Sequence, residues 1–274
     1  QLKSKSNLIE INLGDGEKQY LYYDDSILLK RLSFYPYVQL GVMVLFVLIV
    51  YFALISTKKA EQNKVWVGLS KETAHQLGTP ISSLMAWMDL LESSGVDPSL
   101  LSDMNKDVNR LSVIAERFSK IGSKPEMELI YVNEVLENAT EYMRRRVSDK
   151  VLITTHLPSD AEGAMVCLSL FEWVIENLCK NAVDAMNGEG RIDVYMTSEK
   201  QQIYIDIKDT GKGIARKNFK TVFNPGYTTK KRGWGLGLTL AKRIIEDYHA
   251  GRIYVKDSEV GKGTTFRIEL KRVV

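Results

Sequence analysis

FEWVIENLCKNAVDA, at residues 171–185, has the period of an amphipathic α-helix. Its apolar side chains fall on one stripe, formed by Phe171, Ile175, Leu178, Ala182 and Ala185. Asn177 and Asn181 lie on an adjoining stripe one turn apart, so both amides face the same space. Amide oxygens suit Mg²⁺, which usually bridges substrate phosphates, and the pair therefore predicts a site for a metal ion and phosphates. The alternative is that both are polar caps on a half-buried helix.

A strand and a tight turn are predicted next along the chain. The run at residues 203–207 is strand-like and leads into Asp209-Thr210-Gly211-Lys212-Gly213, which places a carboxylate beside a turn that glycine permits. Asp209 is therefore a candidate acceptor for the amino group of an adenine. Taken alone, such a segment is a common structural turn.

Two further glycine segments follow. Gly233-Trp234-Gly235-Leu236-Gly237-Leu238 opens a helix predicted to run to about Tyr248, and glycines there let backbone amides approach phosphates at a positively polarised helix start. Gly261-Lys262-Gly263-Thr264-Thr265-Phe266 leads into a strand in which apolar residues alternate. Singly, each segment is weak evidence, and the second is most often a hairpin turn.

The segment at residues 214–234 has the composition of a lid. It contains the aromatic residues Phe219, Phe223 and Tyr227 and the basic run Lys230-Lys231-Arg232. We expect Lys230 first, and Arg232 second, to balance the charge of a phosphate. The alternative is an ordinary solvated loop.

A histidine lies within an apolar helical repeat about a hundred residues earlier. The repeat has heptad spacing and is formed by Ala74, Leu77, Ile81, Leu84, Met88 and Leu91. His75 stands one residue off this seam, on a flank that a bulky phosphate donor can reach, and Thr79 shares its face. Alone, such a histidine is usually a plain surface residue.

A second helix is predicted after a break at residues 94–98. Its apolar seam is formed by Leu101, Met104, Val108, Leu111, Ala115 and Phe118. The two helices predict an antiparallel hairpin, and two such hairpins would complete a four-helix bundle in a homodimer.

The order of these motifs resembles the sensor histidine kinases of two-component systems. Asn-x-x-x-Asn, DxGxG, GxGxGL and GxGT follow one another as do the family's N, G1, G2 and G3 boxes. Phe223 matches its F box, and His75, Thr79 and Pro80 match its phosphoacceptor box. The resemblance implies an α/β sandwich that binds Mg-ATP, with Asn181 as the Mg²⁺ ligand. The residues expected to bind ATP are Asn177, Asn181, Asp209, Gly211, Gly213, Phe223, Lys230, Arg232, Gly233, Gly235, Gly237, Leu238 and Thr264.

The resemblance further implies that ATP phosphorylates His75 and that the phosphoryl group then passes to an aspartate of a response regulator. Gln76 departs from the pattern, because family members usually carry an acid there, and we expect its side-chain carbonyl to fix the histidine tautomer. Thr79 is expected to position a water for dephosphorylating the partner. Asp184 also departs, since the family often has a basic residue at that place.

A membrane span is predicted at residues 34–56. Residues 32–57 include no charged side chain, and the apolar part is about 30 Å long as a helix. Residues 1–33, with a predicted β-hairpin, are interpreted as the remnant of an extracytoplasmic sensor region. ATP use then places the kinase on the cytoplasmic side of the inner membrane.

Composition adds little to this interpretation. The formal charge is +3 and the basic residues are dispersed, which does not indicate nucleic-acid binding. Cys167 and Cys179 have apolar neighbours and are expected to be buried thiols, while His156 and His249 are expected to be structural.

The predicted fold class is therefore α+β and multidomain. A dimerisation and phosphotransfer hairpin is expected at residues 57–122 and an ATP-binding domain at residues 123–274. Two other functions stay open: a catalytically silent ATP-binding membrane scaffold, and an ATPase of the gyrase or heat-shock-chaperone type. The second is disfavoured because those ATPases carry a general-base Glu where this chain has Asn177.

Overall fold

The computed structural model describes residues 7–12, 18–23, 27–121, 123, 125–230 and 235–273. The chain divides into two compact units, Gln1–Val65 and Trp66–Val274.

In the first unit, β1 (Asn7–Asn12) pairs antiparallel with β2 (Lys18–Tyr23). This confirms the predicted hairpin, although its turn at residues 14–16 lies outside the described residues. Helix α1 (Ile27–Ser93) begins in this unit, and its segment Arg31–Lys58 is long and apolar enough to cross a membrane by length and composition. The span predicted at residues 34–56 lies inside that segment.

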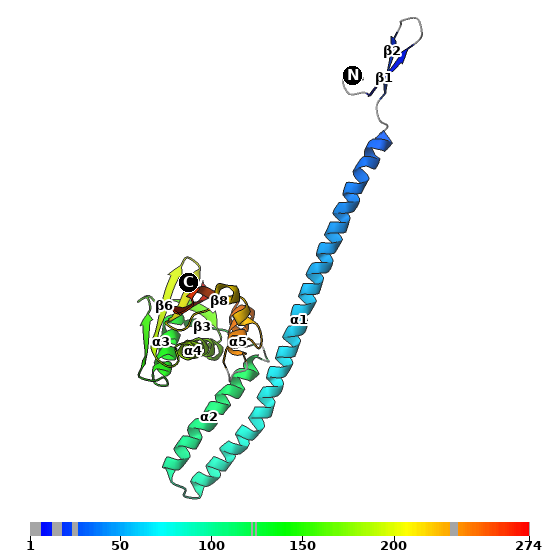
Figure 1. The fold of residues 1–274 in the computed structure, drawn as a ribbon. Helices are drawn as coiled ribbons and strands as arrows, with labels where there is room; N and C mark the ends of the chain where they lie inside the picture. Colours follow the sequence, from blue (N-terminus) through cyan, green and yellow to red (C-terminus); the bar gives the residue numbers. More distant parts are fainter. Residues whose placement is uncertain are drawn as a thin grey trace. The chain divides into compact units, whose positions relative to one another are not determined.

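The second unit begins with a helical hairpin, formed by the last turns of α1 and by α2 (Pro98–Ile121) (Figure 1). The chain reverses at residues 94–97, as predicted. Ile81, Met88, Val108 and Ala115 are buried together between the two helices, with Leu77 packed beside them. Four residues of the predicted seams are exposed on the single chain, and these are Leu84, Leu91, Met104 and Leu111.

The rest of the unit is a sheet covered by helices. The strands are β3 (Glu128–Tyr131), β4 (Val151–His156), β5 (Gly163–Val166), β6 (Gly190–Glu199), β7 (Gln202–Asp209), β8 (Arg252–Glu259) and β9 (Gly263–Val273). Their order is β3-β5-β9-β7-β6-β4, and β8 also pairs with β9. The β4–β6 pair is parallel, and the other pairs of this sheet are antiparallel.

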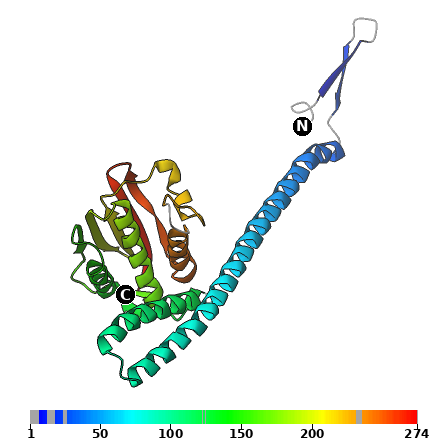
Figure 2. The same cartoon turned by 60° about the horizontal axis from the view of Figure 1, so that its bottom comes forward.

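Three helices pack on one face of this sheet (Figure 2). They are α3 (Val132–Arg144), α4 (Leu168–Ala185) and α5 (Gly237–Arg243), and α5 continues as the π-helical segment η4 (Ile244–Tyr248). Helix α4 lies between the other two and buries Phe171, Ile175 and Leu178 completely or nearly so. The predicted α/β sandwich is confirmed.

Strand β7 has buried apolar residues along its length and a buried aspartate at its end. Its side chains alternate, and Ile203, Ile205 and Ile207 are all buried against the helices. Because successive side chains point to opposite faces of a strand, Asp209 continues the same inward set. The strand therefore delivers a buried carboxylate to the end of the core.

Helix α2 is joined to α4 by a bidentate ion pair. The guanidinium of Arg117 donates to both carboxylate oxygens of Glu176, at 2.6 and 2.9 Å. It also lies 5.7 Å from the ring centroid of Trp173, against which Phe118 packs edge-on. The Tyr248 hydroxyl donates to the Ile121 carbonyl at 2.5 Å, so the end of α2 is tied to both α4 and η4.

We predict that Glu176→Ala loosens the end of α2. The substitution leaves the Arg117 guanidinium, only 12% exposed, without its counter-ion. The expected loss is about 3 kcal/mol, as for other buried pairs that lose one partner. Hydrogen exchange should rise in the last turns of α2 and stay slow in β7.

Glu116→Ala is the matched control for this experiment. Its ion pair with Lys120 is exposed, and its loss should cost less than about 1 kcal/mol. Equal exchange in the two variants would contradict the role given to the Arg117–Glu176 pair.

Candidate functional site

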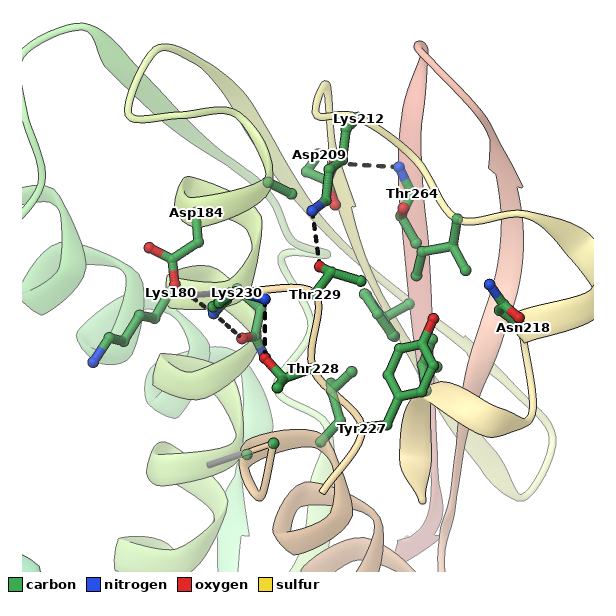
Figure 3. Close-up of a pocket in the computed structure, with 18 of the residues that line it drawn as sticks. Lys180, Asp184, Asp209, Lys212, Asn218, Tyr227, Thr228, Thr229, Lys230 and Thr264 are labelled. Carbon is green, nitrogen blue, oxygen red and sulfur yellow. Dashed lines mark hydrogen bonds and ion pairs between the residues drawn. The ribbon is translucent and has the colours of Figure 1, made fainter. Parts of the chain in front are cut away.

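A pocket of about 400 Å³ opens beside α4 (Figure 3). Its walls come from α4, from the end of β7, from the start of β9, and from the segments at residues 212–230 and 235–238. The residues that line it include Asn177, Asn181, Asp184, Asp209, Gly213, Tyr227, Lys230, Gly235, Gly237, Leu238 and Thr264. Most of the predicted nucleotide residues therefore meet in one cavity.

Helix α4 supplies one wall of the pocket. Asn177, Asn181 and Asp184 recur at steps of four and three, which places them on one face of the helix beside its buried stripe. The Nδ2 atoms of Asn177 and Asn181 are buried and have no hydrogen-bond partner among the described residues. Since an unpaired buried donor is costly, both amides favour a polar ligand in the pocket.

Asp209 lines the pocket at the end of β7 and is 3% exposed. Its Oδ1 atom accepts hydrogen bonds from the backbone amides of Gly211, at 2.8 Å, and Thr264, at 3.3 Å. These bonds join the turn after β7 to the start of β9 and fix the direction of the carboxylate. Burial raises the pKa of this carboxyl more than the two hydrogen bonds lower it.

Two glycines are required by close approaches near the pocket. Gly235 has a φ of +64°, and a Cβ there would lie 2.5 Å from the carbonyl carbon of Gly226. The Gly226 amide donates to the Gly235 carbonyl at 3.2 Å, and this hydrogen bond joins the two glycines. At Gly237, a Cβ would lie 2.5 Å from Asn177 Oδ1. The first turn of α5 thus packs directly on α4.

Residues of the predicted lid reach across the pocket, as Figure 3 shows. The ammonium of Lys230 lies 2.5 Å from Asp184 Oδ2 and 3.1 Å from Asn181 Oδ1. Lys212 donates to the Thr229 hydroxyl at 2.9 Å. Arg232 and Gly233, both predicted to bind ATP, lie outside the described residues.

Two predicted residues do not line the cavity. Phe223 is buried behind the wall, where its ring meets the ring of Phe266 edge-on, and Phe266 does line the pocket. Gly211 is buried beside Ala185, and it acts through the amide that binds Asp209. Both residues support the pocket rather than form its surface.

The sequence interpretation missed some pocket residues. Asp184 stands in the sequence as a departure from the family pattern and not as part of the site, although it shares the face of Asn177 and Asn181. Lys180, Lys212 and Asn218 also line the pocket. Helical spacing was a sufficient signal for Asp184 and for Lys180, which lies three residues after Asn177 and four before Asp184, but not for Lys212 and Asn218.

The histidine lies on a separate surface. His75 is exposed on α1, in an open groove lined by Ala74, His75, Gly78, Thr79, Ser82, Ser83 and Ala86. The other residues that line this groove are small. The Thr79 hydroxyl donates to the His75 backbone carbonyl at 3.4 Å.

The predicted contact of Gln76 with the imidazole is not found among the interactions of the described residues. The Gln76 amide donates instead to Glu72 Oε1 at 2.7 Å. Residues four apart share a helix face, whereas adjacent residues diverge by about 100°. The helix therefore aims Gln76 toward Glu72.

The other predicted structural residues behave as expected. Cys167 and Cys179 are buried free thiols. His249 accepts a hydrogen bond from the Cys167 amide, and His156 stacks on Tyr195. Among the described residues, no group of three or more His, Cys, Asp or Glu side chains is placed to hold a metal ion.

Comparisons with known proteins agree with this geometry. Residues 166–274 match the family described as histidine kinase-, DNA gyrase B-, and HSP90-like ATPase. Sporulation kinase A of Bacillus subtilis (strain 168) is 26% identical over 220 residues, which cover 78% of this chain and 36% of that protein. Sensor histidine kinase ZraS of Salmonella typhimurium (strain LT2) is 26% identical over 226 residues, covering 79% and 48%.

The structure of histidine kinase ThkA in complex with response regulator protein TrrA matches with a TM-score of 0.52 and 17% identity, over 93% of this chain and 69% of that chain. This likeness shows the fold. The chain spans less than half the length of the two curated relatives. The predicted resemblance to histidine kinases is confirmed, and the family match supports ATP as the ligand of the pocket.

We predict that Gly235→Ala lowers the affinity for ATP. Its Cβ would force the backbone away from Gly226 and open the base of the lid. The loss should reach at least tenfold, which corresponds to about 1.4 kcal/mol. Displacement of a fluorescent ATP analogue measures it.

Gly261→Ala is the matched control, because Gly261 has a φ of +83° and a Cβ added there would meet no atom within 4 Å. It carries the same backbone strain without the close approach. If this variant loses as much affinity as Gly235→Ala, strain alone explains the effect and the lid contact does not.

A second prediction concerns pH. Burial raises the pKa of Asp209 in the folded chain above the ordinary value of an aspartate carboxyl. Its contribution to stability is therefore fully present below the unfolded pKa and is lost as the pH rises through the folded pKa. Asp209→Asn should raise the thermal unfolding midpoint at neutral pH, and the gain should vanish toward about pH 4. A gain that does not change with pH would contradict this cause.

Proposed function

We propose that this chain is the transmitting part of a sensor histidine kinase, which phosphorylates its own His75 from Mg-ATP and passes the phosphoryl group to a response regulator. The observation that carries the proposal is the presence, in one chain, of a nucleotide pocket and an exposed histidine on a helical hairpin. Each part alone fits several functions. Together they supply a phosphoryl donor and an acceptor.

The polar wall formed by Asp209 suits an adenine. Because its Oδ1 atom already accepts two backbone hydrogen bonds, Oδ2 is the oxygen left to accept a bond from the adenine amino group. The burial of the carboxylate strengthens such a bond. Leu238 and Tyr227 line the same pocket and provide apolar surface for the base.

The α4 wall suits the phosphates and their metal ion. The amides of Asn177 and Asn181 have buried donors with no partner in the described part of the chain, and Asn181 Oδ1 already contacts a cation, the Lys230 ammonium. An amide oxygen beside a carboxylate is a donor set that Mg²⁺ accepts. When bound, Mg²⁺ would neutralise part of the phosphate charge, and Lys230 and Lys212 would add positive charge from the lid side.

The acceptor is the imidazole of His75. A ring nitrogen attacks the γ phosphorus in line, the N–P bond forms as the bond to the β,γ-bridging oxygen breaks, and ADP leaves. The ring N–H proton passes to solvent, because no described side chain contacts the imidazole to receive it. The exposure of His75 and its small neighbours support this approach.

A response regulator is the proposed second acceptor. The phosphoramidate at His75 would transfer its phosphoryl group to a carboxylate oxygen of an aspartate on that partner. Support comes from ThkA, which has been solved with the response regulator TrrA. Thr79 lies one turn from His75 and is proposed to position a water that hydrolyses the phosphoaspartate of the partner and releases inorganic phosphate.

A homodimer is proposed from the exposed residues of the hairpin seam. Leu84, Leu91, Met104 and Leu111 are each at least 37% exposed in the single chain. Their heptad spacing gives a continuous apolar face, and a second hairpin would bury it in a four-helix bundle. We place the hairpin at residues 57–122 and the ATP-binding domain at residues 123–274.

A membrane location is proposed from the segment Arg31–Lys58. The most hydrophobic part of this segment is not buried by any other part of the described structure, so it does not belong to a protein core. A span there would place residues 1–33 outside the cytoplasmic membrane and the kinase inside, where ATP is available.

The test is incubation of the purified chain with ATP labelled at the γ position. We predict a label that is acid-labile and base-stable and that disappears in His75→Ala. His156→Ala is the matched control, since His156 is also exposed, at 45% of its side chain, and should keep the label. Free phosphate without protein label would support the ATPase alternative, and neither product would support the silent scaffold.

A further inference from the structure

The lid cation and the proposed metal ion require the same oxygens. Lys230 Nζ contacts Asn181 Oδ1 at 3.1 Å and Asp184 Oδ2 at 2.5 Å (Figure 3). These are an amide oxygen and a carboxylate oxygen on one face of α4. Hard divalent cations take oxygen ligands of these two kinds. An ammonium therefore occupies the place where the donor set suits a metal ion.

The Lys230 ammonium can dissociate from Asn181 and Asp184 at little cost in stability. The side chains of Lys230 and Asp184 are 39% and 40% exposed, and an exposed ion pair adds little net stability. The Asn181 amide is anchored on a helix whose neighbouring turns are buried, so the oxygens stay when the lysine moves. Lys230 comes from the lid segment, which is free of helix and strand at residues 224–230.

We propose that Asp184 is a second oxygen ligand of the Mg²⁺ site beside Asn181, and that Lys230 holds this site until Mg²⁺ displaces it. The displaced ammonium is then available to the phosphates that arrive with the metal ion. An acidic residue on the phosphate side of the pocket would otherwise repel the phosphates. As a metal ligand, Asp184 instead contributes to their binding. The inference rests on the proposed function in taking Mg-ATP as the ligand.

The alternative role of Asp184 is to hold the lid segment in place, and it predicts a different dependence on Mg²⁺. If Asp184 only fastened the lid through Lys230, its removal would change ATP affinity by the same factor with and without Mg²⁺. As a metal ligand, Asp184 should strengthen binding only when Mg²⁺ is present. Without Mg²⁺ its charge opposes the phosphates and occupies Lys230, so its removal should strengthen binding.

The experiment compares wild-type chain with Asp184→Asn by calorimetric titration of ATP, once with Mg²⁺ and once with a chelator. We expect the Mg²⁺ enhancement of ATP affinity to fall about tenfold in the variant, the low end of the loss seen when metal-site partners are removed. Affinity in the chelator should rise. Asp247→Asn, an exposed change outside the pocket, is the control and should match wild type.

Lys230→Met tests the same site without nucleotide. Removal of the competing ammonium should increase the affinity of the full chain for Mn²⁺, measured by electron paramagnetic resonance of the free ion. Asp184→Asn should lower it. Circular dichroism checks that each variant is folded.

An unchanged Mg²⁺ enhancement in Asp184→Asn would overturn the inference, as would equal changes with and without Mg²⁺, or no gain of Mn²⁺ affinity in Lys230→Met. These outcomes leave the proposed kinase intact as long as the wild-type chain binds ATP. Failure of the wild-type chain to bind ATP in either condition would contradict the proposed function, and the Mn²⁺ titrations would then decide the metal site alone.

Discussion

The packing of α4 against the inner face of the sheet is the constraint on which the rest of the structure depends. Phe171, Ile175 and Leu178 are buried against the strands, and this fixes the rotation of the helix about its axis. With the rotation fixed, Asn177 and Asn181 can only face the pocket. The chemistry of the site is therefore a consequence of core packing. If the helix shifted by one residue, both amides would turn away from the pocket.

Periodicity carried most of the prediction from the sequence. The heptad seams, the strand ending at Asp209 and the amide pair on α4 are local patterns. The structure confirms the helices and the strand that carry them. Contacts between distant segments were not predictable in this way. Arg117 and Glu176 are 59 residues apart, and Lys230 and Asp184 are 46 apart. The Gln76 amide donates to Glu72 one turn away, and the predicted contact of its side-chain carbonyl with His75 stays a prediction.

The geometry divides the proposed reaction between two surfaces with different demands. The nucleotide pocket has anchored polar groups on α4 and β7 and a cationic lid residue, Lys230, that contacts an oxygen proposed to bind Mg²⁺. The histidine surface has an exposed ring among small side chains. Phosphoryl transfer needs positioning and charge neutralisation more than covalent help, so rigid binding on one surface and access on the other suffice.

Mass-spectrometric localisation of the phosphate, at alkaline pH after incubation with Mg-ATP, tests the central claim most directly. The account predicts one modified histidine, in the peptide that carries His75, and unmodified peptides around His156 and His249. Phosphate on either of those histidines, on a hydroxyl side chain, or nowhere in a chain shown to bind ATP would contradict it.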